Sequence, residues 1–222
     1  MVQKLRQSAK KTKVIKKGMV KMAYVILLTG FLMVSLVNPA PKTIIFFGDS
    51  ITAGYGLDPK VAFPQVVQDQ LQEEGYEVQV INAGLSGETT AGGASRINWI
   101  LRQPVDIFIL ELGGNDGLRG LPLEQTEKNL QLIIDKVKAK NPTVKIVLAG
   151  MQVPPNLGEE YTNNFKKIFP RVAGKNKASL IPFLLDGVGG DEKLNLPDGI
   201  HPNADGHKIV AKNVLKVIRP MM

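Results

Sequence analysis

The chain has 222 residues, a length that predicts one domain or at most two. Its formal net charge is +8, but residues 1–21 hold eight cations and no acid, which leaves 20 cations against 20 acids from residue 22 onward. A nucleic-acid-binding domain needs a surplus of cations on its folded surface, so this balance argues against a nucleic-acid partner. The absence of cysteine excludes a disulfide framework, thiolate zinc sites and a cysteine nucleophile.

Residues 1–40 have the pattern of an export signal peptide or a membrane anchor. The cationic stretch is followed by sixteen uncharged, mostly apolar residues at 22–37 and then by NPAP at 38–41. This order is typical of a secretory signal, although the apolar run approaches the length of a membrane span. A cleaved signal and a retained anchor both stay open, and a start at Met19 or Met22 would leave an ordinary short leader. In either case we expect residues 41–222 to be exported across the cytoplasmic membrane, as a periplasmic or secreted enzyme or as one anchored through residues 22–37.

Residues 41–222 predict one α/β domain. Five runs are the expected strands, at residues 43–48, 77–82, 105–112, 144–149 and 178–182, and four of the five are short and strongly apolar. Helical patterns are expected at residues 61–74, 89–102, 123–139, 158–173 and 204–218. This alternation predicts a central parallel sheet of about five strands with helices on both faces, a three-layer α/β/α sandwich. Such sheets bind ligands at the carboxyl ends of their strands, so the loops after strands are where we expect the chemistry.

Ser50 directly follows the first expected strand and the Gly48-Asp49 turn, which places it at the mouth of the sheet. A serine in this position can act as a nucleophile when a base accepts its proton. It is also a suitable N-cap for a short following helix, and both interpretations are open from the residues alone.

The chain has two histidines, and His201 has the surroundings of a general base. It lies in LPDGIHPN, three residues after Asp198, a spacing that can bring the carboxylate to the imidazole Nδ1–H and fix its tautomer. The structural alternatives are a loop histidine bonded to backbone and an Asx turn at Asp198. We expect His207 to be partly exposed on the last helix, without a catalytic role.

Glycine-rich turns after the second and third strands offer donors for a developing oxyanion. The first reads NAGLSGET at 82–89, where Gly84 or Gly87 can bring a backbone N–H close to a substrate oxygen. The second reads GGND at 113–116, where Asn115 can present its side-chain amide. Each turn taken singly could equally be no more than a turn.

Four segments in order resemble the conserved blocks of the SGNH hydrolases, also called the GDSL esterase/lipase family: GDSIT at 48–52, NAGLSGET at 82–89, GGND at 113–116 and DGIHP at 198–202. The longer run ELGGNDGLRG at 111–120 is similar to the bacterial branch with acyl-CoA thioesterase I, lysophospholipase L1 and arylesterases. The resemblance implies a flavodoxin-like fold. It also implies Ser50, Asp198 and His201 as catalytic residues and Ser50, Gly87 and Asn115 as the oxyanion hole, with Gly84 as the competing glycine.

The same resemblance implies a serine esterase that hydrolyses carboxylic esters or thioesters through an acyl-serine intermediate, with no metal or cofactor. Its expected substrates are small-molecule acyl esters, acyl thioesters or lysophospholipids. The alternatives are an esterase that removes O-acetyl groups from an envelope polysaccharide, and a non-catalytic envelope protein that binds lipid or glycan. The balanced charge after residue 22 predicts a body that does not itself seek anionic membranes.

Overall fold

The computed structural model describes residues 13–14, 16–22 and 40–222, and within it residues 41–222 form one compact unit. The apolar run expected to act as a signal or anchor, residues 22–37, lies outside the described residues except for Met22. Among the residues that are described, no helix is both long enough and apolar enough to cross a membrane.

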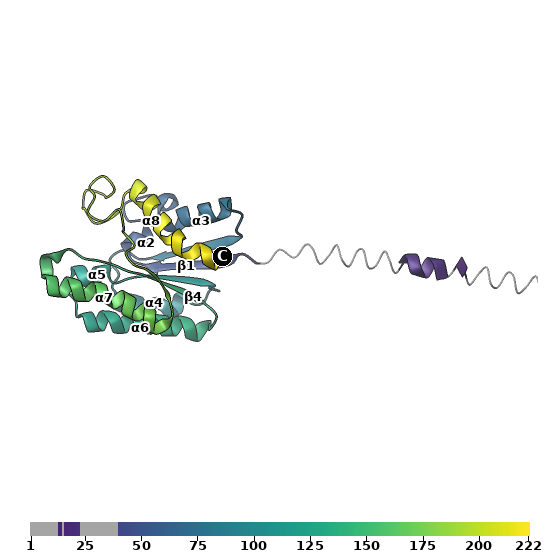
Figure 1. Cartoon of the computed structure of the whole chain (residues 1–222), viewed down its shortest axis with the longest axis horizontal. Helices are drawn as coiled ribbons and strands as arrows, with labels where there is room; N and C mark the ends of the chain where they lie inside the picture. The colour runs from purple at the N-terminus through teal and green to yellow at the C-terminus, as the bar shows by residue number, and fades with distance from the viewer. Residues whose placement is uncertain (1–12, 15, 23–39) are drawn as a thin grey trace, which may run out of the picture. The chain divides into compact units, whose positions relative to one another are not determined.

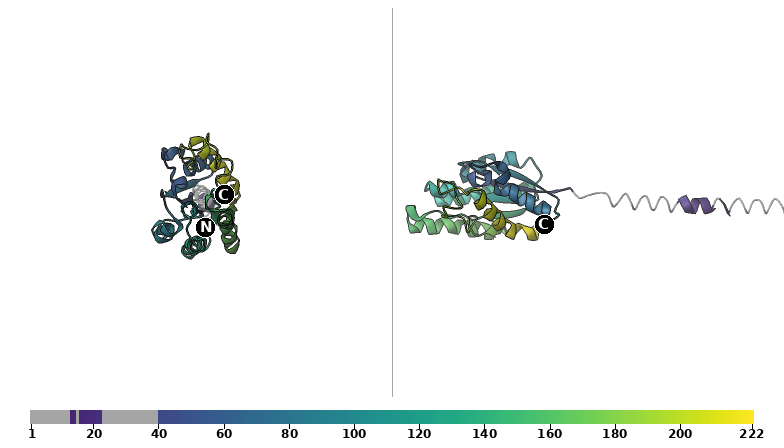
Figure 2. Two further views of the ribbon diagram at one scale, coloured as in Figure 1. Left: turned by 90° about the vertical axis from the view of Figure 1, so that its left-hand side faces the viewer. Right: turned by 90° about the horizontal axis from the view of Figure 1, so that it is seen from above.

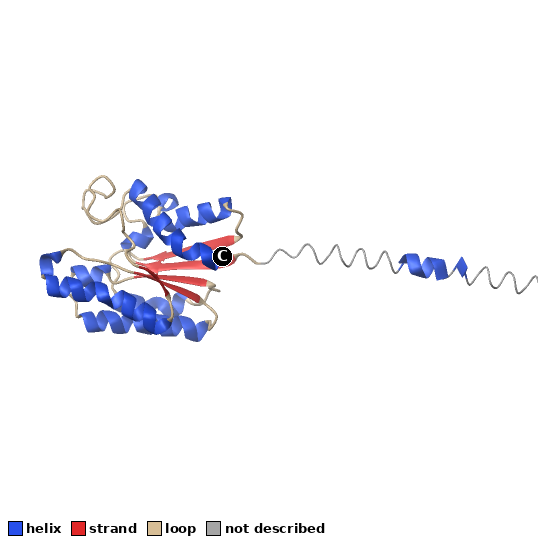
Figure 3. Cartoon of the chain, viewed as in Figure 1, coloured by secondary structure: helices blue, strands red, loops and turns tan. Residues whose placement is uncertain are grey.

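The compact unit is built on a five-stranded parallel sheet with the strand order β2-β1-β3-β4-β5. Figure 3 shows the strands of this sheet in red between the helices. The strands are β1 (Lys42–Gly48), β2 (Val78–Gly84), β3 (Ile107–Glu111), β4 (Lys145–Ala149) and β5 (Ser179–Ile181). The strand order reverses beside β1, and open α/β sheets bind their ligands at such a switch point. This arrangement confirms the expected α/β fold class, a flavodoxin-like sheet of five parallel strands.

Helices cover both faces of the sheet, as Figures 1 and 2 show. The helices α3 (Phe63–Glu73) and α8 (Ala204–Ile218) contact each other on one face. The other face carries α4 (Thr90–Ile100), α6 (Leu123–Lys140) and α7 (Glu159–Asn176), with α6 in contact with both neighbours. Short helices lie in the connections, namely α2 (Ser50–Ala53), α5 (Gly114–Leu118), η1 (Pro59–Val61) and η2 (Pro155–Leu157), and η3 (Arg219–Met221) follows α8.

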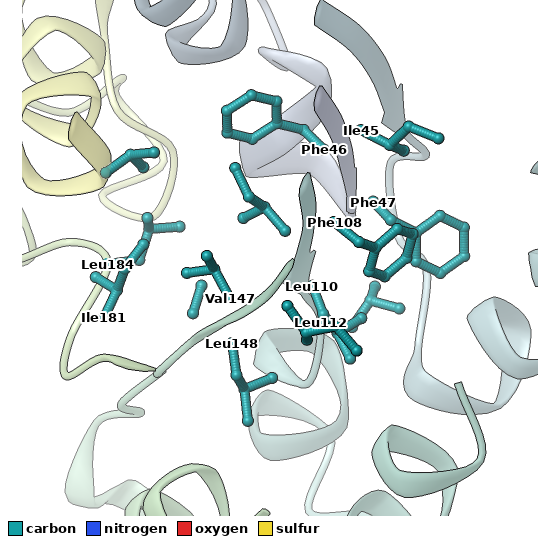
Figure 4. Packing of buried hydrophobic residues seen from close by; sticks show 14 of the residues in the cluster. Ile45, Phe46, Phe47, Phe108, Leu110, Leu112, Val147, Leu148, Ile181 and Leu184 are labelled. Carbon is teal, nitrogen blue, oxygen red and sulfur yellow. The ribbon is translucent and has the colours of Figure 1, made fainter. Parts of the chain in front are cut away.

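The core lies on both faces of the inner strands, β1 and β3 among them, and part of it is shown in Figure 4. Phe46 meets Phe63 of α3 edge-on at 5.3 Å between ring centres, while Phe47 meets Phe108 of β3 at 5.7 Å. Fully burying one such side chain stabilises the fold by about 1.5–3 kcal/mol. The sheet is therefore a firm base for the loops at its carboxyl edge.

Candidate active site

The carboxyl ends of β1, β2 and β3 meet at one edge of the sheet, where each strand is followed by a turn with a predicted site residue. Gly48, the last residue of β1, pairs with the last residue of β2 and the last residue of β3. Ser50 comes soon after β1, Gly87 soon after β2 and Asn115 soon after β3. The register of the sheet thus brings together three turns that are far apart in the sequence.

Ser50 is buried at the first position of α2, and Asp49 is the residue that caps this helix. The Oδ1 atom of Asp49 accepts the N–H of Ile51 at 3.0 Å. The alternative in which Ser50 is the cap is therefore wrong, and its hydroxyl is left to another partner. The turn requires glycine at position 48, because a Cβ atom there would lie 2.3 Å from Glu111 Oε2.

Ser50, His201 and Asp198 form one hydrogen-bonded row. The Oγ atom of Ser50 lies 2.8 Å from His201 Nε2, and His201 Nδ1 lies 2.7 Å from Asp198 Oδ2. The other oxygen, Asp198 Oδ1, accepts the backbone N–H groups of Ile200 and His201, so the Asx turn is present as well. Burial works to raise the pKa of Asp198, but these N–H donors and the imidazole lower it to about 2. The carboxylate is therefore ionised at neutral pH.

The ring of Tyr55 lies against the imidazole of His201, a contact that the sequence did not predict. The two ring centres are 4.5 Å apart, with an angle of 38° between the planes. Tyr55 lies between two glycines with positive φ, Gly54 and Gly56, and its N–H donates to the Ser50 carbonyl. The imidazole of His201 is thus packed against an aromatic ring beside Ser50.

The two candidate glycines of the second turn occupy very different places. Gly84 N–H donates to Asn82 Oδ1 at 3.0 Å, and a Cβ atom on Gly84 would lie 2.2 Å from the backbone nitrogen of Ala53. Gly87 has a φ of +79°, and its N–H has no hydrogen-bond partner among the described residues. Of the two, only Gly87 has a backbone donor available for a substrate oxygen.

The turn that contains Gly87 is held in place by the ion pair between Arg96 and Glu88. Arg96 of α4 binds the buried carboxylate of Glu88, and it also donates to the Ala83 carbonyl at 2.8 Å. The guanidinium lies over the ring of Phe47, 4.2 Å from its centre. On the outer side, Arg119 donates to the Gly87 carbonyl at 3.0 Å.

Asn115 stands between this turn and the Ser50 turn. Its Nδ2 atom donates to Asp49 Oδ2 at 3.1 Å and to the carbonyl of Glu88 at 3.0 Å. Both hydrogens of the amide are therefore engaged within the chain. The amide ties the two donor-bearing turns to each other.

Two buried carboxyl groups, Asp49 and Glu111, lie directly behind Ser50. Glu111 Oε2 accepts the Asp49 N–H at 3.1 Å and the Thr52 hydroxyl at 2.7 Å, while Oε1 has no partner among the described residues. Burial raises the pKa of Asp49 to about 6, and burial followed by the charge of Asp49 raises the pKa of Glu111 well above its usual range. Glu111 could have been noticed in the sequence as an acid that ends a wholly apolar strand.

An apolar cavity of about 340 Å³ opens beside the Ser50 turn. Ile51 and Gly114 lie at its inner side, and Ile200 belongs to the loop that carries His201. The remaining wall is mostly apolar and includes Leu118, Met151, Val153, Pro154, Phe183 and Leu185. A cavity of this kind can hold the hydrocarbon part of a substrate next to the serine.

His207 is fully buried, so the expectation of a partly exposed side chain is wrong. Its Nδ1 atom accepts the N–H of Phe63 at 3.1 Å, and its ring stacks on the Phe63 ring. Burial, followed by the charge of His201, lowers the pKa of His207 to about 4, which keeps the ring neutral. It joins α8 to the start of α3. Within the described part of the chain, no three His, Asp or Glu side chains gather closely enough to hold a metal ion.

Chemically, the row can transfer a proton from the Ser50 hydroxyl to His201 while the ionised Asp198 stabilises the resulting imidazolium. Two backbone donors, the N–H groups of Ser50 and Gly87, are without partners among the described residues. These groups and the nearby Asn115 amide can bind a negative oxygen. The arrangement suits attack on an acyl carbon.

Curated relatives resemble the chain over most of its length. It is 38% identical over 200 residues to the esterase TesA of Pseudomonas aeruginosa, covering 89% of this chain and 98% of the relative. It is 34% identical to an arylesterase of Vibrio mimicus, with 83% and 92% covered, and 35% identical to thioesterase 1/protease 1/lysophospholipase L1 of Escherichia coli, with 82% and 86% covered. A crystal structure of TesA superposes with a TM-score of 0.78 at 38% identity, over 82% of this chain and 100% of that chain.

The family model for GDSL-like lipases/acylhydrolases matches residues 46–209, which include all four sequence blocks. This match and the relatives over 30% identical confirm the predicted family and enzyme class. The chain therefore belongs to the GDSL-like lipase/acylhydrolase family and is a serine hydrolase that acts on ester bonds.

Proposed function

We propose that Ser50 is the nucleophile, that His201 is the general base, and that Asp198 orients the imidazole. The observation that carries this assignment is the row from Ser50 Oγ to His201 Nε2, at 2.8 Å, and from His201 Nδ1 to Asp198 Oδ2, at 2.7 Å. Nucleophile–base and base–carboxylate contacts of this length are the geometry that such catalysis needs. The apolar cavity beside Ser50 supports the same position for the reacting acyl group.

The oxyanion formed during attack would be held by three donors: the N–H groups of Ser50 and Gly87 and the side-chain amide of Asn115. The two N–H groups have no other partner among the described residues, which supports their role. The Asn115 amide already donates to Asp49 and to the Glu88 carbonyl, so one of these bonds has to yield when the oxyanion forms. Donors that act only in the transition state raise the rate rather than the affinity.

The reaction then has two steps. Ser50 Oγ bonds to the carbonyl carbon while its proton moves to His201 Nε2, and the tetrahedral intermediate collapses as His201 gives that proton to the leaving alcohol or thiol. Water next attacks the acyl-serine, again with His201 as base, and releases the carboxylic acid and free Ser50. No metal or cofactor takes part in either step.

The substrates we propose are fatty acyl esters of small alcohols, lysophospholipids and acyl thioesters. The relatives are named as an esterase, a thioesterase and a lysophospholipase, which supports these three substrate classes. The apolar cavity of about 340 Å³ can hold the acyl chain. The test of substrate class is the activity on nitrophenyl esters of increasing chain length, with a lysophospholipid and an acyl-CoA alongside. Activity that is confined to acetyl esters would instead favour a polysaccharide O-acetyl esterase.

The test of the assignment compares Ser50→Ala and His201→Ala with Ser95→Ala, an exposed serine on α4. Loss of the nucleophile or of the general base lowers turnover by roughly 10⁴–10⁶-fold. Both site variants should therefore lack ester hydrolysis, while Ser95→Ala keeps it. A phosphonate probe should label the wild type and Ser95→Ala but leave Ser50→Ala unlabelled. Retained turnover in clean Ser50→Ala protein would refute the proposal.

We also infer that residues 1–40 carry the enzyme across the cytoplasmic membrane, as a signal peptide or a retained anchor. The support is the order of the leader, with eight cations before the apolar run at 22–37. Fractionation with N-terminal sequencing distinguishes the two forms, since cleavage gives a new N-terminus near Pro41 in a soluble fraction and an anchor leaves the intact chain with the membrane. Intact chain recovered from the soluble cytoplasm would contradict both.

A further inference from the structure

The charges of residues 41–222 sum to zero, yet the structure separates them between the two edges of the sheet. All five strands are parallel, so each helix that follows a strand starts near the carboxyl edge, which holds the candidate active site, and ends near the opposite edge. Residues at helix ends and strand starts therefore share that opposite edge. Figure 1 shows the C-terminus at the end of the sheet where β1 begins.

Six exposed cations lie on the edge opposite the active site, and we name this surface the basic edge. None of them forms a salt bridge with a described residue. Two contacts tie its elements together: Lys145 at the start of β4 donates to the Met221 carbonyl, and Lys138 near the end of α6 donates to the carbonyl of Asn176 at the end of α7. The six residues of the basic edge are Arg102, Lys140, Lys145, Lys175, Lys177 and Lys216.

Acids offset the charge of this surface only in part. Most acids of the same edge lie beside β2, where Glu74 pairs with Arg219. Glu73 and Glu77 are exposed there as well. Asp106, directly before β3, accepts the Thr43 N–H. The active-site edge instead carries six exposed acids that form no salt bridge with a described residue. They are Asp58, Glu159, Glu160, Asp186, Asp191 and Glu192.

Helix dipoles account for part of this pattern but not for all of it. A cation in the last turn of a helix is favourable, which explains Lys140, Lys175 and Lys216. Arg102 directly follows the C-cap of α4 and is favoured in the same way, whereas Lys145 begins a strand and has no helix terminus of its own. The surplus at this edge makes it a surface on which a partner of negative charge can bind.

The chain's one tryptophan indicates what that partner is. Trp99, in the last turn of α4, is 63% exposed and lies three positions before Arg102. Between the ends of α4 and α6 there is a hollow of about 360 Å³, lined by Arg102, Lys136 and Lys140 together with uncharged residues. Tryptophan is favoured at the headgroup level of membranes, and cations near the surface attract anionic lipids. A nucleic acid would also be drawn to the cations, but one exposed tryptophan on the helix that carries Arg102 suits a lipid headgroup better.

We propose that the basic edge, together with Trp99, binds the anionic phospholipid surface of a membrane, with the active site opening at the far edge of the sheet. The leader supports this orientation, because residues 1–40 join the domain at Lys42, the first residue of β1, on the same edge. Binding of this kind depends on where the charges lie rather than on their sum. The equal numbers of cations and acids, 20 of each, predicted no affinity of the domain for anionic membranes. This sum does not reflect that unpaired cations and unpaired acids lie at opposite edges of the sheet.

The test uses residues 41–222, because the leader's apolar run would bind vesicles by itself. This part holds all the strands and the hydrophobic core that the structure describes, and the solved TesA chain matches 82% of this chain over its full length. Flotation is measured with vesicles of phosphatidylglycerol and phosphatidylcholine and with vesicles of phosphatidylcholine alone. The triple variant Arg102→Glu, Lys140→Glu, Lys175→Glu is compared with Lys60→Glu, Lys193→Glu, Lys208→Glu, which makes the same charge change at the active-site edge.

We expect the wild-type domain to bind the anionic vesicles and to be released by salt. Each cation at a membrane surface contributes roughly fivefold to binding, so the basic-edge triple, which reverses three charges, should lose at least about 100-fold, and the control triple less than about fivefold. Trp99→Ala should weaken binding several-fold, and the basic-edge triple should keep its turnover of a short soluble ester. Equal binding to both kinds of vesicle, an equal loss in the two triples, or binding to duplex DNA but not to vesicles would overturn the proposal.

Discussion

Asp49 is an acid held in the interior directly beside the proposed nucleophile. It is 2% exposed, and both of its oxygens accept hydrogen bonds, from Ile51 N–H and from Asn115. Neither donor is a cation, and Glu111 lies behind it as a second carboxyl group. The position of Asn115 therefore depends on an acid whose ionisation is itself unfavourable in this place.

Asp49→Asn should change how stability depends on pH. The pKa of Asp49 rises from 3.8 to about 6 on folding, so the native state holds this proton more tightly than the unfolded chain does. The resulting stabilisation is fully present below pH 3.8 and is lost as the pH rises to about 6. Across this window the free energy of unfolding of the wild type should fall relative to that of Asp49→Asn, as measured by urea unfolding.

Asp198→Asn is the matched control, since the pKa of Asp198 is lowered to about 2 rather than raised. Its contribution is present above the usual Asp pKa and is lost as the pH falls toward 2, outside the window of Asp49. Parallel curves for the wild type and Asp49→Asn between pH 4 and 6 would show that Asp49 keeps an ordinary pKa.

Asn115→Ala should lower kcat by roughly 10²–10³-fold with little change in KM, because the amide is expected to bind the oxyanion only as it develops. Steady-state kinetics on a nitrophenyl ester measure both constants. Asn163→Ala, an exposed asparagine on α7, serves as the control and should leave both unchanged. An effect on KM alone would mean that Asn115 binds substrate and transition state equally and that another donor fills the role.

At the scale of elements, the end of β2 and the turn after it hold two glycines with different roles: Gly84 packs against α2, and Gly87 is the proposed oxyanion donor. Gly84 closes the strand against the backbone of α2, and Gly87 extends into the open with a positive φ. Gly87 is held from outside by Arg119 and, through Glu88, from inside by Arg96. The two glycines should therefore respond differently to the same substitution.

Gly84→Ala should destabilise the protein severely, since its Cβ atom would lie 2.2 Å from Ala53 N with only backbone around it. In Gly87→Ala the nearest atom to the new Cβ, Arg119 Nη2, is 3.8 Å away, so the loss of stability should be limited to about 1 kcal/mol or a little more from the positive φ. The same change should lower kcat by shifting the proposed donor. Thermal unfolding and kcat measured on both variants check this, and a greater loss of kcat in well-folded Gly84→Ala would reverse the assignment.

The sequence predicted the five strands and five long helices because their apolar periodicity reflects burial directly. The register of α6 is an example, with Leu130, Ile133, Ile134 and Val137 all buried. Where α5 lies, the sequence indicates only a glycine-rich turn, since the five residues GNDGL hold two glycines and too few positions for a periodic pattern. His207 was misjudged because one side chain's burial depends on which helix packs against it, here α3. The hydrogen-bonded row from Ser50 to Asp198 could be expected only from the combination of motifs, because Ser50 and His201 are 151 positions apart in the sequence.

At the scale of the whole molecule, the boundary between leader and domain falls at the first backbone hydrogen bond between β1 and the segment that leads into β2. Lys42 N–H donates to the Glu77 carbonyl at 2.9 Å, and its side chain reaches the carbonyls of the last two residues. Every residue of the proposed site and of the core lies after this point. Folding and chemistry should therefore need nothing that precedes Pro41.

A chain of residues 41–222 should fold and hydrolyse a short nitrophenyl ester with the same kcat/KM as the full-length protein. A chain that starts at Phe46 should fail to fold, because it lacks Ile44 and Ile45, which are fully buried in the central strand. Replacing one such side chain alone costs about 2–5 kcal/mol, and a domain of this size is stable by only about 5–15 kcal/mol. Circular dichroism melting and ester turnover on the three chains decide the matter, with Ser50→Ala in the 41–222 chain as the measure of background hydrolysis. An inactive but folded 41–222 chain would show that the leader contributes to the site, and an active chain from Phe46 would show that β1 is not the centre on which the sheet depends.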